Sequence, residues 1–327
     1  MTELKPFQKA TVKAVINAFK CKEYARRFLV ADEVGLGKTV VAQQVIKQVM
    51  RGKNRPLIVF YVCSSLSIAS QNRTKLLEII EDEAERETAA STVDRLTLLP
   101  ASALPEHPRL HLYTLTPDTS IPVRSGRRRD GRQEERALIH ALVESIWPDF
   151  FKEHGKTFFR RNAHTWWPDW VRYYRKQVRS NTRLREAFHQ SVRTEFNLKS
   201  RQRFLAAIRD EEDSLKLIAH FRNALAASAL DEIKPDLVIF DEFQRFRDLL
   251  NQEIDGAAAR VIGKLRGEGK GRSPALLLLS ATPYRLFTQR WEDAQGTEHH
   301  TEFFNLIEFL YGGNETAQLM RAECETG

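Results

Sequence analysis

The chain has 327 residues, of which 42% are hydrophobic and 29% charged, a composition that excludes an intrinsically disordered protein. No apolar run approaches the length of a membrane span, and the three isolated cysteines argue against a disulfide framework or a zinc site. The formal net charge of +8 favours a polyanionic partner, nucleic acid above all, and the N-terminus lacks a signal-peptide pattern, which fits a cytoplasmic protein without membrane association.

The N-terminal part of the chain predicts a helix, a strand and a phosphate-binding loop. Pro6 suits the first turn of a helix whose apolar positions recur at three or four residues, and Gln8 lies in that turn. Residues 27–31 predict a buried strand, and residues 40–50 predict a second helix. Between them stands the turn Asp-Glu-Val-Gly-Leu-Gly-Lys-Thr, residues 32–39.

A strand, a glycine-bearing turn ending in Gly-Lys-Thr and a helix form the context of a phosphate loop. Gly35 and Gly37 let successive backbone N–H groups point at phosphate oxygens. Lys38 reaches the β- and γ-phosphates, and the Thr39 hydroxyl binds Mg²⁺. The predicted cofactors are therefore ATP and Mg²⁺, and the predicted contacts are Gln8, Glu33, Val34, Gly35, Leu36, Gly37, Lys38 and Thr39.

Two further strands end in loops rich in hydroxyl groups. Residues 56–62 predict a buried strand that leads into Ser64 and Ser65 and then a helix. Residues 110–115 predict another, followed by a turn that holds Thr116, Thr119 and Ser120. Ordinary strand-to-helix loops have the same composition, so the pattern alone leaves their role open.

A basic loop with Arg127, Arg128 and Arg129 follows, and it reads either as a solvated connection or as a segment that faces phosphates. From residue 134 to about 229 the apolar spacing is helical throughout, which predicts an inserted helical subdomain. Its aromatic cluster, residues 166–174, stands among arginines and could stack on bases, but we favour a hydrophobic core.

The last motifs follow two apolar strands, residues 236–240 and 276–279. The first delivers Asp241 to hold Mg²⁺ through water and Glu242 to deprotonate the attacking water. Gln244 can sense the γ-phosphate through hydrogen bonds. The second strand ends in Ser280, Ala281 and Thr282, and residues 303–310 predict a final helix.

Taken in order, these motifs resemble those of the first RecA-like lobe of superfamily-two helicases, closest to bacterial Swi/Snf-related helicases of the DEAD/DEAH type. The resemblance implies an α/β fold in which a parallel P-loop sheet is flanked by helices and carries a large all-helical insertion. It also implies that Gln8 reads adenine and that the motif of residues 280–282 couples ATP hydrolysis to nucleic-acid movement. Nucleic-acid contacts are expected at Ser64, Ser65, Thr116, Thr119, Ser120 and the three consecutive arginines.

The chain departs from that family in two motifs. Asp32 stands at the first glycine position of the phosphate loop, and Asp-Glu-Phe-Gln replaces the commoner Asp-Glu-Ala-His. Only 45 residues follow Thr282, too few for a second RecA-like lobe, and no arginine-rich motif supplies arginine fingers. We therefore expect a truncated form or a fragment that binds nucleotide with weak or no turnover unless a second lobe or a partner subunit completes it.

The expected organisation is a first lobe part over residues 1–130, the insertion over 131–230, a second lobe part over 231–315 and a truncated tail over 316–327. The leading hypothesis is the ATP-binding lobe of a helicase or translocase that acts on double-stranded DNA. The alternatives are a non-hydrolysing regulatory module that binds nucleotide or nucleic acid, and a phosphate-loop ATPase that acts on protein. Gln8 and the motif of residues 280–282 argue against the last.

Overall fold

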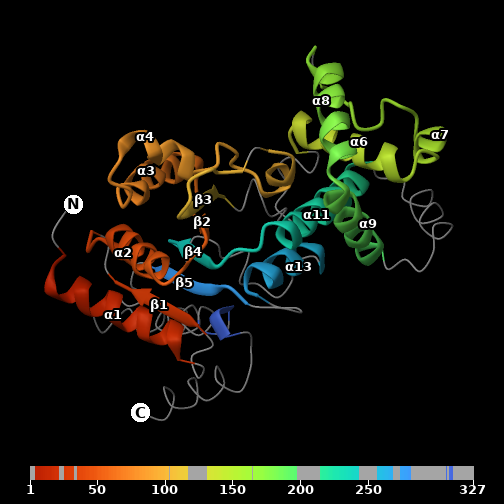
Figure 1. Cartoon of the computed structure of the whole chain (residues 1–327). Coiled ribbons are helices and arrows are strands. Elements are labelled where there is room, and N and C mark those ends of the chain that lie inside the picture. The colour runs from red at the N-terminus through yellow and green to blue at the C-terminus, as the bar shows by residue number, and fades with distance from the viewer. Residues whose placement is uncertain are drawn as a thin grey trace, which may run out of the picture.

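The computed structural model describes residues 4–21, 26–32, 35–102, 104–116, 131–163, 165–196, 214–242, 256–267, 273–280, 307 and 309–311, and of residues 256–260 the backbone alone. Its centre is a five-stranded, fully parallel sheet flanked by helices (Figure 1). The strands are β1 (Arg27–Ala31), β2 (Leu57–Val62), β3 (Leu110–Leu115), β4 (Leu237–Asp241) and β5 (Ala275–Ser280). Each coincides with a predicted apolar run, and the α/β, RecA-like fold class is confirmed.

The order of the strands is β1-β5-β4-β2-β3. The strand β5 therefore separates β1, which leads into the phosphate loop, from β4, which carries the acidic pair. Ala31 is in register with Ser280, and Asp241 is in register with Leu279. Because all strands run the same way, the carboxyl ends of β1, β4 and β5 lie at one edge of the sheet.

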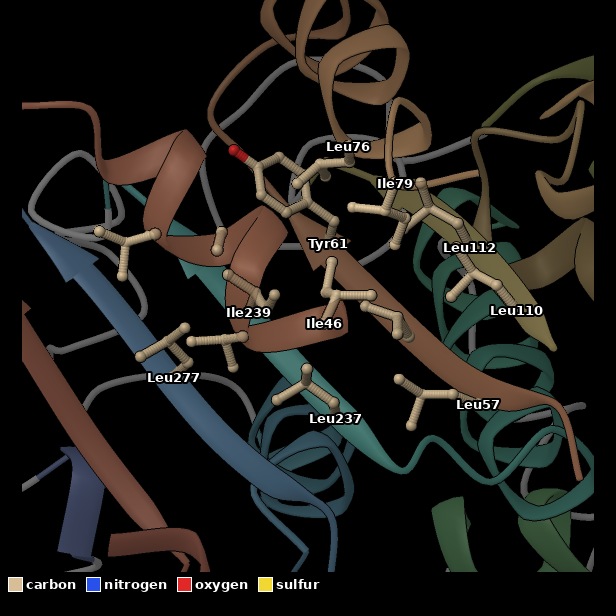
Figure 2. Close-up of a cluster of buried hydrophobic side chains, with 14 of the residues drawn as sticks. Ile46, Leu57, Tyr61, Leu76, Ile79, Leu110, Leu112, Leu237, Ile239 and Leu277 are labelled. Carbon is tan, nitrogen blue, oxygen red and sulfur yellow. The ribbon is translucent and has the colours of Figure 1, made fainter. Parts of the chain in front are cut away.

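One face of the sheet is covered by three helices, α1 (Pro6–Lys20), α2 (Lys38–Arg51) and α3 (Leu66–Leu77). Alternate strand residues point into this layer, as the pleat of a strand requires. Figure 2 shows Ile46 of α2 and Leu76 of α3 beside strand residues such as Leu57 and Leu277. All four side chains are fully buried.

The other face packs against α11 (Ser214–Glu232), α13 (Gly256–Leu265) and the short 3₁₀ helix η2 (Leu96–Ala101). The intervening strand residues, among them Phe60, Val238 and Leu278, are fully buried in this second core. Residues 307 and 309–311, the described residues at the end of the predicted final helix, also belong to this core. Both faces of the sheet are thus covered, as in other parallel sheets.

In the described residues between β3 and β4, helices joined by turns are the regular structure. The helices are α6 (Gln133–Ile146), α7 (Phe150–His154), α8 (Trp167–Ser180), α9 (Thr182–Glu195) and α11. They enclose a third core rich in aromatic rings, and Figure 1 shows α8 at the outer end of this helical body. The helix α11 takes part in two cores, since Phe221 packs among these helices whereas Leu230 packs under the sheet.

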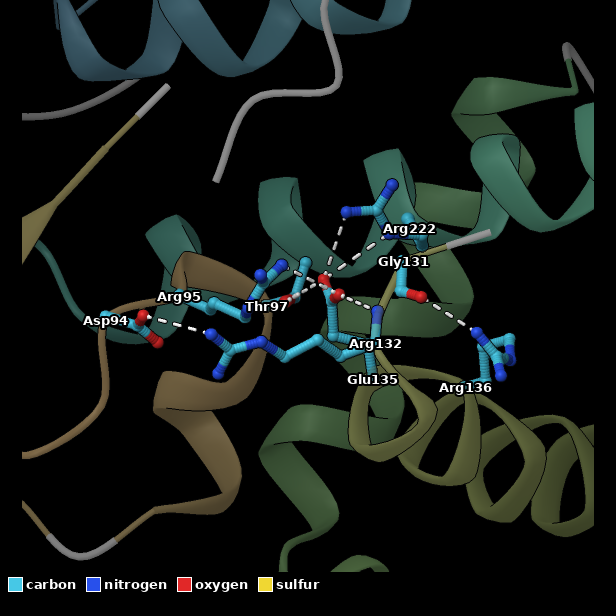
Figure 3. A network of polar contacts seen from close by, with 8 residues as sticks. All are labelled: Asp94, Arg95, Thr97, Gly131, Arg132, Glu135, Arg136 and Arg222. Atoms are coloured by element: carbon cyan, nitrogen blue, oxygen red, sulfur yellow. Dashed lines mark hydrogen bonds and ion pairs between the residues drawn. The ribbon is translucent and has the colours of Figure 1, made fainter. Parts of the chain in front are cut away.

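A buried charge network joins the helical body to the rest of the molecule (Figure 3). The carboxylate of Glu135 on α6 is fully buried and forms ion pairs with Arg95 at 3.1 Å and with Arg222 of α11 at 3.2 Å. It also accepts a hydrogen bond from the Thr97 hydroxyl at 2.7 Å and one from the Arg132 N–H at 2.7 Å. Burial alone would raise the pKa of Glu135, but the two guanidinium groups and these donors outweigh it and lower the pKa.

Two short helical turns lie between α3 and η2. The 3₁₀ turn η1 (Glu87–Ala89) follows the single-turn helix α4 (Glu83–Arg86), and the next residue, Ala90, forms a bridge to Leu112 of β3.

No helix in the described residues is both long and apolar enough to cross a membrane.

Candidate nucleotide site at the carboxyl edge of the sheet

The phosphate loop has the backbone geometry that its glycines predict. Gly35 and Gly37 have φ values of +90° and +84°, in the left-handed region that favours glycine. Gly37 is also the N-cap of α2, and its carbonyl accepts the first helical hydrogen bonds from Val40 and Val41. No side chain caps the N-terminus of this helix, so its first N–H groups and its positive dipole end face the loop.

Gln8 lies against this loop, and the structure gives its amide two protein partners. Its Nε2 donates to the Leu36 carbonyl at 2.9 Å, and its Oε1 accepts from the Lys5 N–H at 3.0 Å. A Cβ on Gly37 would lie 2.6 Å from Gln8 Nε2, so the loop and the glutamine are closely fitted. Gln8 therefore braces the phosphate loop against α1, while the reading of adenine stays a prediction.

Lys38 is the first residue of α2 and is buried. Its Nζ donates to the Asp32 carbonyl at 3.0 Å and lies 3.6 Å from Oε1 of Glu242. The backbone of Glu242 has a φ of +55°, a strained value for a residue other than glycine. Such strain is concentrated at functional sites, where surrounding contacts hold it in place. The structure thus brings the lysine of the phosphate loop and the second carboxylate of the acidic pair together.

Asp241 is held by two residues that the sequence motifs did not indicate. Its Oδ2 accepts hydrogen bonds from the Tyr61 hydroxyl and from Asn72 Nδ2, the latter at 3.1 Å. Asn72 Nδ2 also donates to the Tyr61 hydroxyl at 2.9 Å, which closes a buried triangle. Tyr61 comes from β2 and Asn72 from α3, so this triangle links the helix after the serine loop to the strand of the acidic pair.

The surroundings of Asp241 set its protonation. Burial raises the pKa of its carboxyl, and the Glu242 carboxylate adds to this effect, while the Tyr61 hydrogen bond and the Lys38 ammonium oppose it. Burial and the charge of Asp241 also raise the pKa of Tyr61, which keeps its hydroxyl protonated as a donor. A bound Mg²⁺ would favour the ionised form of the carboxyl, because a cation inverts the local preference.

The donor set at this edge fits ATP with Mg²⁺. The left-handed glycines, the uncapped start of α2 and Lys38 can surround phosphate oxygens. Asp241 and the hydroxyl of Thr39, the second residue of α2, are oxygen ligands of the kind that Mg²⁺ prefers. In the described residues no group of three histidine, cysteine or acidic side chains forms a metal cluster.

The predicted nucleic-acid contacts lie in different surroundings. The Ser64 hydroxyl is buried and has no hydrogen-bond partner among the described residues. Ser65 is the N-cap of α3 and accepts from the Ile68 N–H at 3.4 Å, which gives it a structural role as well. Thr116 is only 2% exposed, so its side chain is not accessible to nucleic acid in this arrangement. Ser280, at the end of β5, is fully buried, and its carbonyl accepts from the Asp32 N–H at 3.3 Å.

The remaining predicted site residues lie outside the described residues. They are Glu33, Val34, Thr119, Ser120, Arg127, Arg128, Arg129, Gln244, Ala281 and Thr282.

Comparison with known protein families gives a match for the first part of the chain. The family described as "Type III restriction enzyme, res subunit" matches residues 1–99, which include α1, β1, the phosphate loop, α2, β2 and α3. No curated protein and no solved structure matches the chain. The match supports a helicase-like, ATP-binding domain of superfamily two, as the motifs predict. The first 99 residues of this chain are thus similar to the res subunit of type III restriction enzymes.

Proposed function

We propose that this chain is the ATP-binding lobe of a helicase or translocase that moves on double-stranded DNA. The observation that carries the proposal is the meeting of Lys38 with Glu242, 3.6 Å apart, beside a loop of two left-handed glycines. Phosphate binding at the start of α2 and a carboxylate pair at the end of β4 are the parts that phosphoryl transfer to water requires. The finer assignment to Swi/Snf-related helicases rests on the motifs alone.

Each side chain has a specific task in this proposal. Lys38 and the loop N–H groups bind the β- and γ-phosphates, and Thr39 and Asp241 hold Mg²⁺. The metal, when bound, neutralises charge on the transferred phosphoryl group. Glu242 orients a water molecule and accepts its proton, and a second RecA-like lobe or a partner subunit closes over the nucleotide.

The test is calorimetric titration of the chain with ATP and Mg²⁺. Lys38→Ala removes the point charge that contacts the phosphates, so it should abolish binding while leaving thermal unfolding cooperative. Lys47→Ala, a change of the same kind further along α2, is the matched control and should bind as the wild type does. Unchanged affinity in Lys38→Ala would refute the phosphate-loop assignment.

A non-hydrolysing regulatory module that binds nucleotide or nucleic acid is the second candidate. ATP turnover stimulated by duplex DNA separates the two candidates when the lobe is assayed with its second lobe. In that form Glu242→Gln should keep ATP binding and lose turnover by orders of magnitude. Equal rates in the variant and the wild type would place the general base elsewhere.

A further inference from the structure

One face of α8 carries a concentration of positive charge. Arg172, Arg175, Lys176 and Arg179 are exposed and, with Ser180, line an open hollow of about 640 Å³. Their spacing of three and four residues places them on the same side of the helix. The opposite side, with Val171 and Val178 among others, is buried in the aromatic core. The charge is therefore presented outward by a helix that is fixed from behind.

Carboxylates neutralise only part of this face. Arg175 forms a two-pronged ion pair with Glu144 at 2.6 and 2.7 Å, and Arg172 pairs with Asp169 at 3.1 Å. In the part of the chain that the structure describes, no ion pair involves Lys176 or Arg179. An excess of cations on one helix face creates a local positive potential that attracts a polyanion.

Two aromatic rings border the charged face. Trp166 is 67% exposed and Tyr173 is 45% exposed, which is unusual for large rings that could be buried. Tyr173 is held edge-on by Tyr174 at 5.0 Å and by Trp170 at 6.2 Å between ring centres. The neighbouring Trp167, by contrast, is 6% exposed and belongs to the core. The aromatic cluster of the sequence is therefore divided: one part is core, as predicted, and the other is surface.

We propose that this face of α8 binds a single strand of nucleic acid. The guanidinium and ammonium groups contact its phosphates, and Tyr173 and Trp166 stack on its bases. Aromatic rings alternating with cations are the combination by which proteins hold single strands without reading their sequence. A membrane-binding helix would instead present a broad apolar face, which α8 buries in its own core. The inference rests on the nucleic-acid part of the proposed function and assigns it a second contact surface.

The contribution of the cationic side chains of α8 is tested by fluorescence anisotropy. A labelled oligothymidylate is titrated with the full chain at several salt concentrations. The triple variant Arg172→Gln, Lys176→Gln, Arg179→Gln should weaken binding and lower the slope of log affinity against log salt by about two, since each single-strand phosphate contact contributes about 0.7. The matched control removes three positive charges from α1 through Lys9→Gln, Lys13→Gln and Lys20→Gln. It should change the slope by much less.

Stacking is tested with Tyr173→Ala, which should weaken oligothymidylate binding about tenfold, in line with the loss of one stacked base. Tyr173→Phe keeps the ring and should bind like the wild type, which would show that the ring and not the hydroxyl contributes the affinity. Trp166→Ala should act like Tyr173→Ala. Both alanine variants should melt like the wild type because their side chains are exposed, whereas Trp167→Ala should lower the melting temperature.

The outcomes separate this inference from the proposed function. If the wild type binds the oligonucleotide and the α8 variants bind equally well, the α8 surface is wrong and the proposed function stands. Equal losses in the α8 and α1 triple variants would show a general charge effect and also overturn it. A wild type that binds vesicles of phosphatidylserine and no nucleic acid contradicts both, while ATP binding remains tested separately through Lys38.

Discussion

The Asp241 carboxylate depends on side chains that lie outside the motif that supplies it. Tyr61 and Asn72 both donate to Oδ2 of Asp241, and the backbone N–H of Glu242 adds a further hydrogen bond to this carboxyl. Partners of this kind fix the orientation of a ligand, and their loss in metal sites typically reduces metal affinity about 10- to 100-fold. The two residues are therefore expected to act on Mg²⁺ through Asp241.

Tyr61→Phe provides the test at this residue. It should raise the Mg²⁺ concentration needed for half-maximal ATP binding about tenfold or more, because the carboxylate loses one of its two side-chain donors. Tyr113→Phe is a matched control on β3, where another buried phenol packs edge-on against Phe60 in the core on the other face of the sheet. The assignment fails if both variants show the same Mg²⁺ dependence in calorimetry.

At the residue scale the sequence predicted what local motifs specify. Lys38 and Asp241 were identified because each stands at a fixed distance from a strand or a glycine turn. Tyr61 and Asn72 were not, since they meet Asp241 across 180 and 169 positions of the chain. One local signal existed: Asn72 stands between Ala69 and Leu76 on the buried side of α3, where a polar residue needs a partner.

At the scale of elements, the apolar runs predicted all five strands because parallel strands buried on both faces lack alternation. The helical spacing of the insertion was likewise predictive. What spacing could not indicate is that α11 serves two cores. Its consecutive buried residues, from Asn223 to Leu230, surround the helix on all sides, and only the fold shows which neighbour each side meets.

The packing of α6, α7 and α8 around His140 makes the helical body sensitive to acid. The ring of His140 lies 4.5 Å from that of Phe151 and 5.9 Å from that of Trp167, and its Nδ1 has no hydrogen-bond partner among the described residues. Burial lowers the pKa of His140 to about 4, with Arg175 acting in the same direction and Glu144 against it. An unfolded histidine titrates near 6.5.

Between the native pKa of about 4 and the unfolded pKa near 6.5, the histidine is protonated in the unfolded chain and neutral in the native one. The contribution to stability is complete above about pH 6.5 and is lost as the pH falls toward 4, by at most about 3 kcal/mol. His140→Phe should reduce the fall in melting temperature between about pH 7 and about pH 5. A variant that loses as much stability as the wild type would show that other groups cause the acid sensitivity.

At the scale of the whole molecule, Glu135 joins segments from three parts of the chain. Its partners Arg95 and Arg222 are separated from it by 40 and 87 positions. Removing one member of a buried ion network leaves its partners buried without compensation, which costs about 3–5 kcal/mol. The pairing therefore fixes how the helical body sits on the lobe.

Glu135→Gln should lower the free energy of unfolding in urea by about 3–5 kcal/mol. Glu144→Gln is the matched control, because it removes a carboxylate whose pairing with Arg175 is partly exposed, and it should cost about 1 kcal/mol or less. Comparable losses in the two variants would mean that the network around Glu135 is not the main connection.

The course of α11 has a mechanical consequence. The helix has 19 residues, which corresponds to a rod about 28 Å long. Its first half packs among the helices of the third core, which also holds α8, and its second half packs against the sheet. Four residues separate the end of α11 from the start of β4, and that strand ends at Asp241. The helix α11 therefore connects the helices around α8 to the strand that ends at Asp241, so a displacement of the outer helices would be transmitted to this edge of the sheet through one helix.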